Sequence, residues 1–163
     1  MGGPGVAARS SSPTASLPET HESPRRAKAG SGGASRRRDI RARPARSIDA
    51  LLAEARSGLS RLKPRQALDA LHEGALLVDT RSEDEQREQG GLVPGAVHYP
   101  LSVVLWRLDS LPRDTHVVLI CRQGYSSSLA AARLQELGFH RATDVIDGVE
   151  GWQAAGLPLE PVT

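Results

Sequence analysis

The sequence is poor in aromatic residues and has a single cysteine. Aromatic side chains make up 3% of its 163 residues, so a core must be built mainly from Leu, Val, Ile and Ala. A lone cysteine can form neither an internal disulfide nor a metal site made of several cysteines. Cys121 is therefore either a small buried side chain or a residue kept for its chemistry.

Long apolar runs are also missing. No stretch approaches the roughly 18 apolar residues that indicate a membrane span. The first residues also lack the apolar run of a secretory signal. We therefore expect a cytoplasmic protein that has no membrane partner.

Residues 1–47 lack the apolar side chains that a folded domain needs. Gly, Ser, Pro, Ala and Arg dominate there, and such a segment cannot bury enough surface to offset its conformational entropy. It carries ten Lys/Arg and three Asp/Glu, a net charge of +7, whereas residues 48–163 carry −5. We expect a disordered basic tail over 1–47, which binds nucleic acid weakly if at all, and one domain over 48–163.

Strand-like and helix-like patterns alternate along residues 48–163. The apolar runs predict strands over 59–62, 75–79, 96–99, 116–120 and 142–146. Helical spacing predicts helices over 48–57, 64–71, 101–108, 126–137 and 151–155, and the charged segment 82–89 is helical or irregular. This alternation predicts a three-layer α/β domain with a central parallel sheet and helices on both faces. Sites in such sheets form beyond the carboxyl ends of the strands.

Cys121 follows the most apolar strand and comes shortly before a helix expected to start at Ser126. The connecting turn should aim backbone N–H groups and the positive end of the helix dipole at the sulfur. Both would favour a thiolate over a thiol. Gly124 allows the backbone to approach closely, Ser126 and Ser127 can cap the helix, and Arg122 adds a positive charge at the rim.

Four segments, in order, resemble the rhodanese family of sulfurtransferases. The resemblance covers residues 71–159, roughly half of the chain. One departure is Ser126, because the family often has arginine there. The segments are the strand end with Asp79 and Arg81, the stretch GLVPGAVHYP at 91–100, the loop CRQGYS at 121–126, and the segment DGVEGW…GLP at 147–158.

The resemblance implies transfer of sulfane sulfur in two steps. The Cys121 thiolate would take the outer sulfur of a donor such as thiosulfate, and the persulfide would pass it to cyanide, a small thiol or a protein cysteine. No cofactor and no metal are implied. Asp79 and Arg81 either support the site and bind the donor, or form an ion pair that ties their loop to the sheet. The residues implied to bind substrate are Arg122, Gln123, Gly124, Tyr125, Ser126 and Ser127.

Other interpretations stay open at this point. The domain could be a persulfide carrier or protein-binding module without turnover. It could also be an arsenate reductase or phosphatase, although the related phosphatases have a longer loop with arginine where Ser127 stands. Trp106 and Trp152 are expected to pack in the interior, and His98 is expected to be a hydrogen-bonded structural residue.

Overall fold

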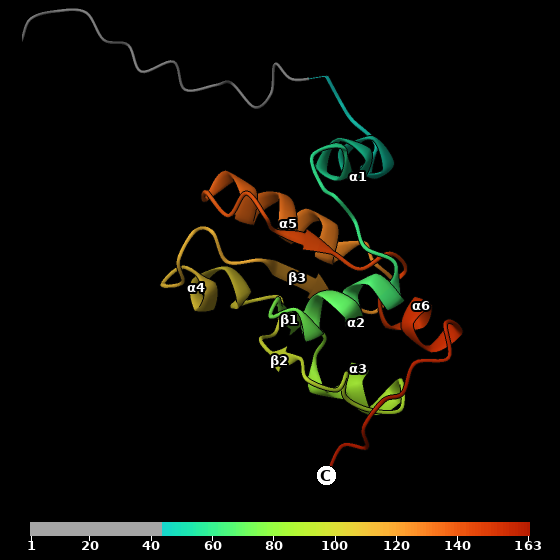
Figure 1. Cartoon of the computed structure of the whole chain (residues 1–163). Coiled ribbons are helices and arrows are strands. Elements are labelled where there is room, and N and C mark those ends of the chain that lie inside the picture. Colours follow the sequence, from blue (N-terminus) through green and yellow to red (C-terminus); the bar gives the residue numbers. More distant parts are fainter. Residues whose placement is uncertain (1–43) are drawn as a thin grey trace, which may run out of the picture. The chain divides into compact units, whose positions relative to one another are not determined.

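The computed structural model of the protein describes residues 44–163 (Figure 1). Most of the predicted tail, residues 1–43, lies outside the described residues. Apart from a strand expected between the first two helices, the described part has helices and short strands in the order expected from the sequence. The helices are α1 (Ile48–Ser57), α2 (Pro64–His72), α3 (Glu83–Glu88), α4 (Val104–Leu108), α5 (Ser126–Glu136) and α6 (Gly148–Ala154); the strands are β1 (Leu76–Asp79), β2 (Val97–His98), β3 (Val117–Ile120) and β4 (Thr143–Asp144).

The strands form one parallel sheet in the order β2-β1-β3-β4. All four residues of β3 are buried, as is typical of a parallel strand covered on both faces. The register pairs Asp79 at the end of β1 with Ile120 at the end of β3. The polar residues that follow these two strands therefore emerge side by side at the carboxyl edge of the sheet.

Helices cover both faces of the sheet, which confirms the predicted three-layer α/β fold (Figure 1). On one face, α2 and α6 contribute Ala67, Ala70, Val149 and Trp152 to a cluster with Leu77, Val118 and Ile120. On the other face, α4 and α5 contribute Val104, Leu108, Ala131 and Leu134 to a cluster with Val78, Val117 and Leu119. Aliphatic residues thus dominate both layers, as the shortage of aromatics requires.

Several predicted elements are shorter in the structure or start at another residue. Residues 59–62 were expected to form a strand, but only Leu62 pairs with the sheet, through a parallel bridge to Val145. Pro64 starts α2 two residues later and leaves no room for a longer strand. The helix predicted over 101–108 starts only at Val104, and the last helix starts at Gly148, earlier than expected.

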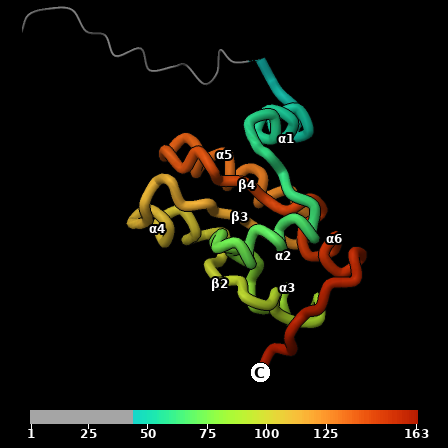
Figure 2. The backbone as a smooth tube through the Cα atoms, viewed as in Figure 1, coloured from blue at the N-terminus to red at the C-terminus, as the bar shows by residue number. Residues whose placement is uncertain are grey.

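The C-terminal segment returns across the domain and lies beside α3 (Figure 2). Leu92 and Glu160 form an antiparallel bridge, with backbone hydrogen bonds of 2.7 and 2.8 Å. Gln153 in α6 also donates to the carbonyl of Gln89 at 2.9 Å. These contacts fasten the end of the chain to the loop that follows α3.

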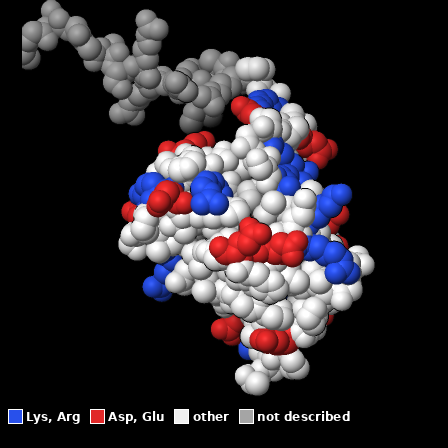
Figure 3. All heavy atoms as spheres, viewed as in Figure 1, with Lys and Arg blue, Asp and Glu red and all other residues white. Residues whose placement is uncertain are grey.

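The surface of the described domain carries charges of both signs. Figure 3 shows acidic and basic side chains interspersed over the face in view. Within residues 44–163, no helix has the length and apolar character required to cross a bilayer. Trp106 is 77% exposed, so the expectation that it packs in the interior is wrong, whereas Trp152 is fully buried.

Candidate functional site

Cys121 lies at the carboxyl end of β3 and is 5% exposed. The Gly124 amide donates to its Sγ at 3.1 Å, and the thiol donates to Ser127 Oγ at 3.1 Å. Gly124 has φ +82°, and a Cβ there would lie 2.9 Å from the Asp147 nitrogen. Glycine is therefore needed both for the backbone conformation and for the close packing of the loop.

Backbone amides at the start of α6 form hydrogen bonds to the Cys121 loop. The amide of Val149 donates to the Cys121 carbonyl at 2.8 Å, and that of Glu150 donates to the Arg122 carbonyl at 3.1 Å. Gly148 has φ +55°, and a Cβ at this position would lie 2.2 Å from the Cys121 carbonyl oxygen. Only a glycine allows this approach, so α6 and the loop are fitted to each other.

A pocket of about 300 Å³ opens beside the Cys121 sulfur. Six residues predicted from the sequence line it: Cys121, Arg122, Gln123, Tyr125, Ser126 and Arg81. Gly124 and Ser127 contact the sulfur but do not line the pocket. Asp79 does not line the pocket either, but it pairs with Arg81, which does. Sequence reasoning missed the remaining lining residues, Thr80, Glu85 and Leu101.

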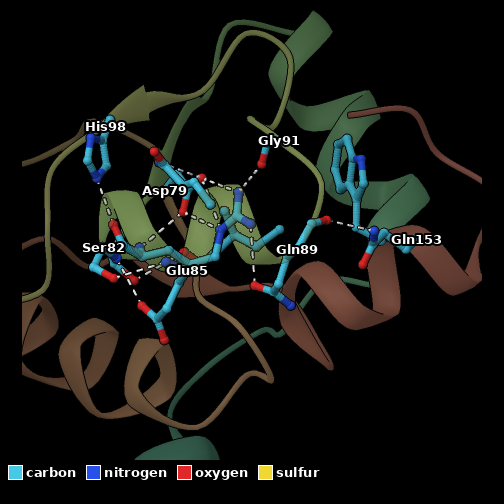
Figure 4. A network of polar contacts seen from close by, with 12 residues as sticks. Asp79, Ser82, Glu85, Gln89, Gly91, His98 and Gln153 are labelled. Atoms are coloured by element: carbon cyan, nitrogen blue, oxygen red, sulfur yellow. Dashed lines mark hydrogen bonds and ion pairs between the residues drawn. The ribbon is translucent and has the colours of Figure 1, made fainter. Parts of the chain in front are cut away.

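Asp79 and Arg81 form a buried ion pair at one wall of the pocket. Arg81 Nη2 donates to Asp79 Oδ2 at 2.7 Å, and the two side chains are 3% exposed or less. The same guanidinium donates to the Gly91 carbonyl at 2.9 Å and to Gln89 Oε1 at 3.3 Å. The surrounding network of polar contacts is drawn in Figure 4. These contacts favour the structural interpretation of the pair, because the guanidinium is committed to the protein itself.

His98 contacts the same loop, with its Nε2 2.6 Å from the Arg81 carbonyl oxygen (Figure 4). Its ring is thus held by the loop that follows β1. The contact agrees with the structural role expected for this histidine.

Arg122 extends along the rim of the pocket, with its side chain 45% exposed. Its guanidinium lies 3.6 Å from a Glu88 carboxylate oxygen and 3.7 Å from one of Glu150. Gln123 Nε2 donates to the same Glu150 at 3.2 Å. The positive charge expected at the rim is present there, but it is shared with two carboxylates.

A buried carboxylate lies beneath the loop. Asp144 in β4 is fully buried, and its Oδ2 accepts from Ser127 Oγ at 2.8 Å and from Ser128 Oγ at 2.7 Å. The prediction that Ser126 and Ser127 cap the helix is wrong, because Tyr125 is the N-cap of α5 and no side chain caps it. The Ser127 hydroxyl is drawn instead to the negative charge of the neighbouring strand.

Two arginines complete this buried network. Arg61 donates to both carboxylate oxygens of Asp144, at 2.8 and 3.2 Å, and to the Gly124 carbonyl at 3.2 Å. Arg56 donates to the same carbonyl at 2.7 Å and to Ser128 Oγ at 3.1 Å. Sequence reasoning missed all three charged residues. The signal for Asp144 was a carboxylate inside a segment predicted to be a strand.

The arrangement suits a site in which a cysteine nucleophile reacts with an anionic reagent. Within residues 44–163, no three His, Cys, Asp or Glu side chains are grouped so that they could hold a metal ion. The Gly124 amide donates to the sulfur, and an open pocket lies beside it. The site can therefore hold a negatively charged sulfur and admit a small reagent to it.

Comparison with known proteins identifies related sequences. The profile of the rhodanese-like domain matches residues 63–155. A sulfurtransferase of Allochromatium vinosum is 34% identical over 87 residues, which span 53% of this chain and 79% of the relative. The thiosulfate sulfurtransferase GlpE of Actinobacillus succinogenes is 37% identical over 100 residues, which span 61% of this chain and 88% of the relative.

Solved structures are also similar to this chain. The polysulfide-sulfur transferase homodimer of Wolinella succinogenes matches with a TM-score of 0.58 and 26% identity, over 68% of this chain and 85% of that one. A protein of unknown function from Rhodopseudomonas palustris, described as a possible tyrosine phosphatase, matches with a TM-score of 0.62 and 28% identity, over 72% of this chain and 97% of that one.

Proposed function

The chain belongs to the family of rhodanese-like domains, and from this premise we propose that it transfers sulfane sulfur through a persulfide on Cys121. The observation that carries the proposal is the position of the Cys121 sulfur, which is held by the Gly124 amide at the base of an open pocket. Two relatives that act on sulfur compounds, by their names, support this reaction class.

The reaction consists of two displacements at sulfur. With thiosulfate as donor, the Cys121 thiolate attacks the outer sulfur. The S–S bond of the donor breaks, its electron pair leaves with sulfite, and a persulfide forms on Cys121. An acceptor (cyanide, a small thiol or a protein cysteine) then attacks the outer sulfur. The electron pair of the broken bond returns to Cys121, which is a thiolate again.

The pocket provides for both displacements. A persulfide would extend from the Cys121 sulfur into the pocket, where Arg122 and Gln123 at the rim can meet the oxygens of an anionic donor. Tyr125 and Leu101 add apolar surface at the same opening. The Gly124 amide would stabilise the charge on the sulfur before uptake and after discharge.

A phosphatase activity has less support in the geometry. One related structure is described as a possible tyrosine phosphatase. In this chain, however, Ser127 occupies the position where the related phosphatases carry arginine, and its hydroxyl faces the Asp144 carboxylate. A doubly charged phosphate in the loop would lie near this buried carboxylate, and position 127 would offer it no guanidinium.

Intact mass spectrometry after incubation with thiosulfate tests the proposal. Wild-type protein should gain one sulfur atom and lose it on addition of cyanide, with release of thiocyanate. Cys121→Ser should gain none, because a hydroxyl is almost never ionised at neutral pH, and a matched melting temperature would show that its fold is retained. Sulfur uptake without turnover would instead indicate a persulfide carrier. No uptake at all, combined with hydrolysis of a phosphate ester, would replace the proposal by a phosphatase.

A further inference from the structure

We propose that Asp144 is a positioning residue that tunes Cys121 through the Ser127 hydroxyl. This inference rests on the sulfur transfer proposed above. Ser127 Oγ lies 3.1 Å from the Cys121 sulfur and 2.8 Å from Asp144 Oδ2. A hydroxyl has one proton to donate, so the sulfur and the carboxylate compete for the same donor.

Asp144 can release Ser127 without being left unsatisfied. Its Oδ2 also accepts from Ser128 at 2.7 Å, and Arg61 donates to Oδ1 and Oδ2 at 2.8 and 3.2 Å. The carboxylate is thus held in place by partners other than Ser127. The Ser127 hydroxyl is the movable member, and it can turn from the carboxylate to the sulfur.

The competition sets how strongly the loop stabilises a thiolate. While Ser127 donates to Asp144, its lone pairs face the sulfur, and a thiolate would keep only the Gly124 amide as a donor. The Asp144 charge also lies within about 6 Å of the sulfur, because the two hydrogen bonds of 3.1 and 2.8 Å are in series. Both effects act against a negative charge on the sulfur.

The other charges around the sulfur are fixed by the fold. Beneath the loop, Arg56 and Arg61 bind the Gly124 carbonyl. Across the pocket, Arg81 is neutralised by Asp79, while Glu85 and Arg122 line the opening. Asp144 is the acidic group within this set that shares a hydrogen-bond donor with the sulfur.

The basicity of Cys121 affects the two displacements in opposite directions. Taking up sulfur requires a good nucleophile, and nucleophilicity rises with basicity. Giving up sulfur requires a good leaving group, which a less basic thiolate provides. Asp144 would therefore favour uptake at the expense of discharge.

Asp144→Asn removes the charge at nearly constant size and frees Ser127 to donate to the sulfur. We expect the midpoint of Cys121 alkylation against pH to move down by about 1–2 pH units, as a charge at this distance implies. Where Cys121 is fully ionised, sulfur uptake should slow about threefold for each unit of that shift. Discharge of the loaded protein to cyanide should become faster.

Two further variants separate this role from support of the fold. Asp109→Asn is the matched control, because Asp109 forms an exposed ion pair with Arg113 and should leave all three measurements unchanged. Ser127→Ala removes the shared donor while Ser128 and Arg61 still hold Asp144. It should lower the alkylation midpoint, because the neutral thiol loses the hydroxyl that accepts its proton. In its background, Asp144→Asn should shift the midpoint less than in wild type.

The outcomes are distinct. A merely structural Asp144 would leave the midpoint in place and slow uptake and discharge together, which would overturn the proposal. An equal shift with and without Ser127 would overturn the role of the hydroxyl. If Asp144→Asn does not fold, an unchanged alkylation midpoint in Ser127→Ala is by itself enough to overturn the proposal. Failure of the wild type to gain sulfur would refute the sulfur transfer, and the alkylation profiles would still test the link between Asp144 and Cys121.

Discussion

Replacing Arg81 with methionine should destabilise the protein by about 3–5 kcal/mol, because the change removes one partner of a buried ion pair. Asp79 is 2% exposed and would lose the guanidinium that now lies 2.7 Å away. It would keep the backbone amide of residue 81 at 3.1 Å and Gln86 Nε2 at 3.3 Å. These two donors offset part of the loss, so we expect about 3 kcal/mol, the lower end of that range.

Urea unfolding at neutral pH measures this loss. The midpoint should fall while the slope against urea concentration stays the same. Arg87→Met is the matched control, because Arg87 is 55% exposed and pairs with Glu83 and Asp84 at the surface. It should change the free energy of unfolding by less than about 0.5 kcal/mol.

A double variant measures the interaction between Asp79 and Arg81 apart from their contacts with other residues. Adding Asp79→Asn to Arg81→Met removes the stranded charge, so the double variant should be less destabilised than the sum of the two single variants. If Arg81→Met costs less than about 1 kcal/mol, the ion pair does not hold the loop after β1 and the reasoning from burial is refuted.

Two other predictions concern single side chains. Arg122→Ala should lower kcat/KM for thiosulfate by about fivefold or less, because the exposed guanidinium is shared with Glu88 and Glu150; an equal loss with an uncharged sulfur donor would contradict a role in anion binding. Burial, and next the charge of Arg141, lower the pKa of His116 from 6.5, with Glu73 opposing. The unfolded chain therefore binds this proton more readily, and stability should fall as the pH drops through about 6.5 and below. His116→Asn should flatten that slope in urea unfolding between about pH 7 and pH 5, and an unchanged slope would exclude His116 as its source.

The sequence allowed the sheet to be predicted because its central strand β3 is buried on both faces. A run such as 117–120 has no polar position, and its burial is complete in the structure. The segment 59–62 is short and close to Pro64, so its sequence does not show how many of its residues pair with the sheet. In the structure only Leu62 pairs. Trp106 shows that residue type alone does not predict burial, since apolar side chains also occur at the surface.

The outer side of the site was easier to predict than its inner side. Residues 121–126 are contiguous in the chain, so the loop that forms much of the pocket could be predicted as a unit. The support beneath it comes from Arg56, Arg61 and Asp144, which are brought together only by the packing of α1, β4 and the chain before α2. Nothing local distinguishes these two arginines from surface arginines. Ser127 was assigned to helix capping because its true partner lies 17 residues away.

The bracing of the Cys121 loop by α6 has a consequence for the order in which the site is made. The amides of Val149 and Glu150 that hold the carbonyls of Cys121 and Arg122 belong to a helix near the end of the chain. Proteins are synthesised from the amino terminus, so the nucleophile is translated well before its brace. A chain that stops short of residue 148 would carry the cysteine but not the contacts that fix its loop. The shape of the reactive centre is therefore completed only when nearly the whole chain has been made.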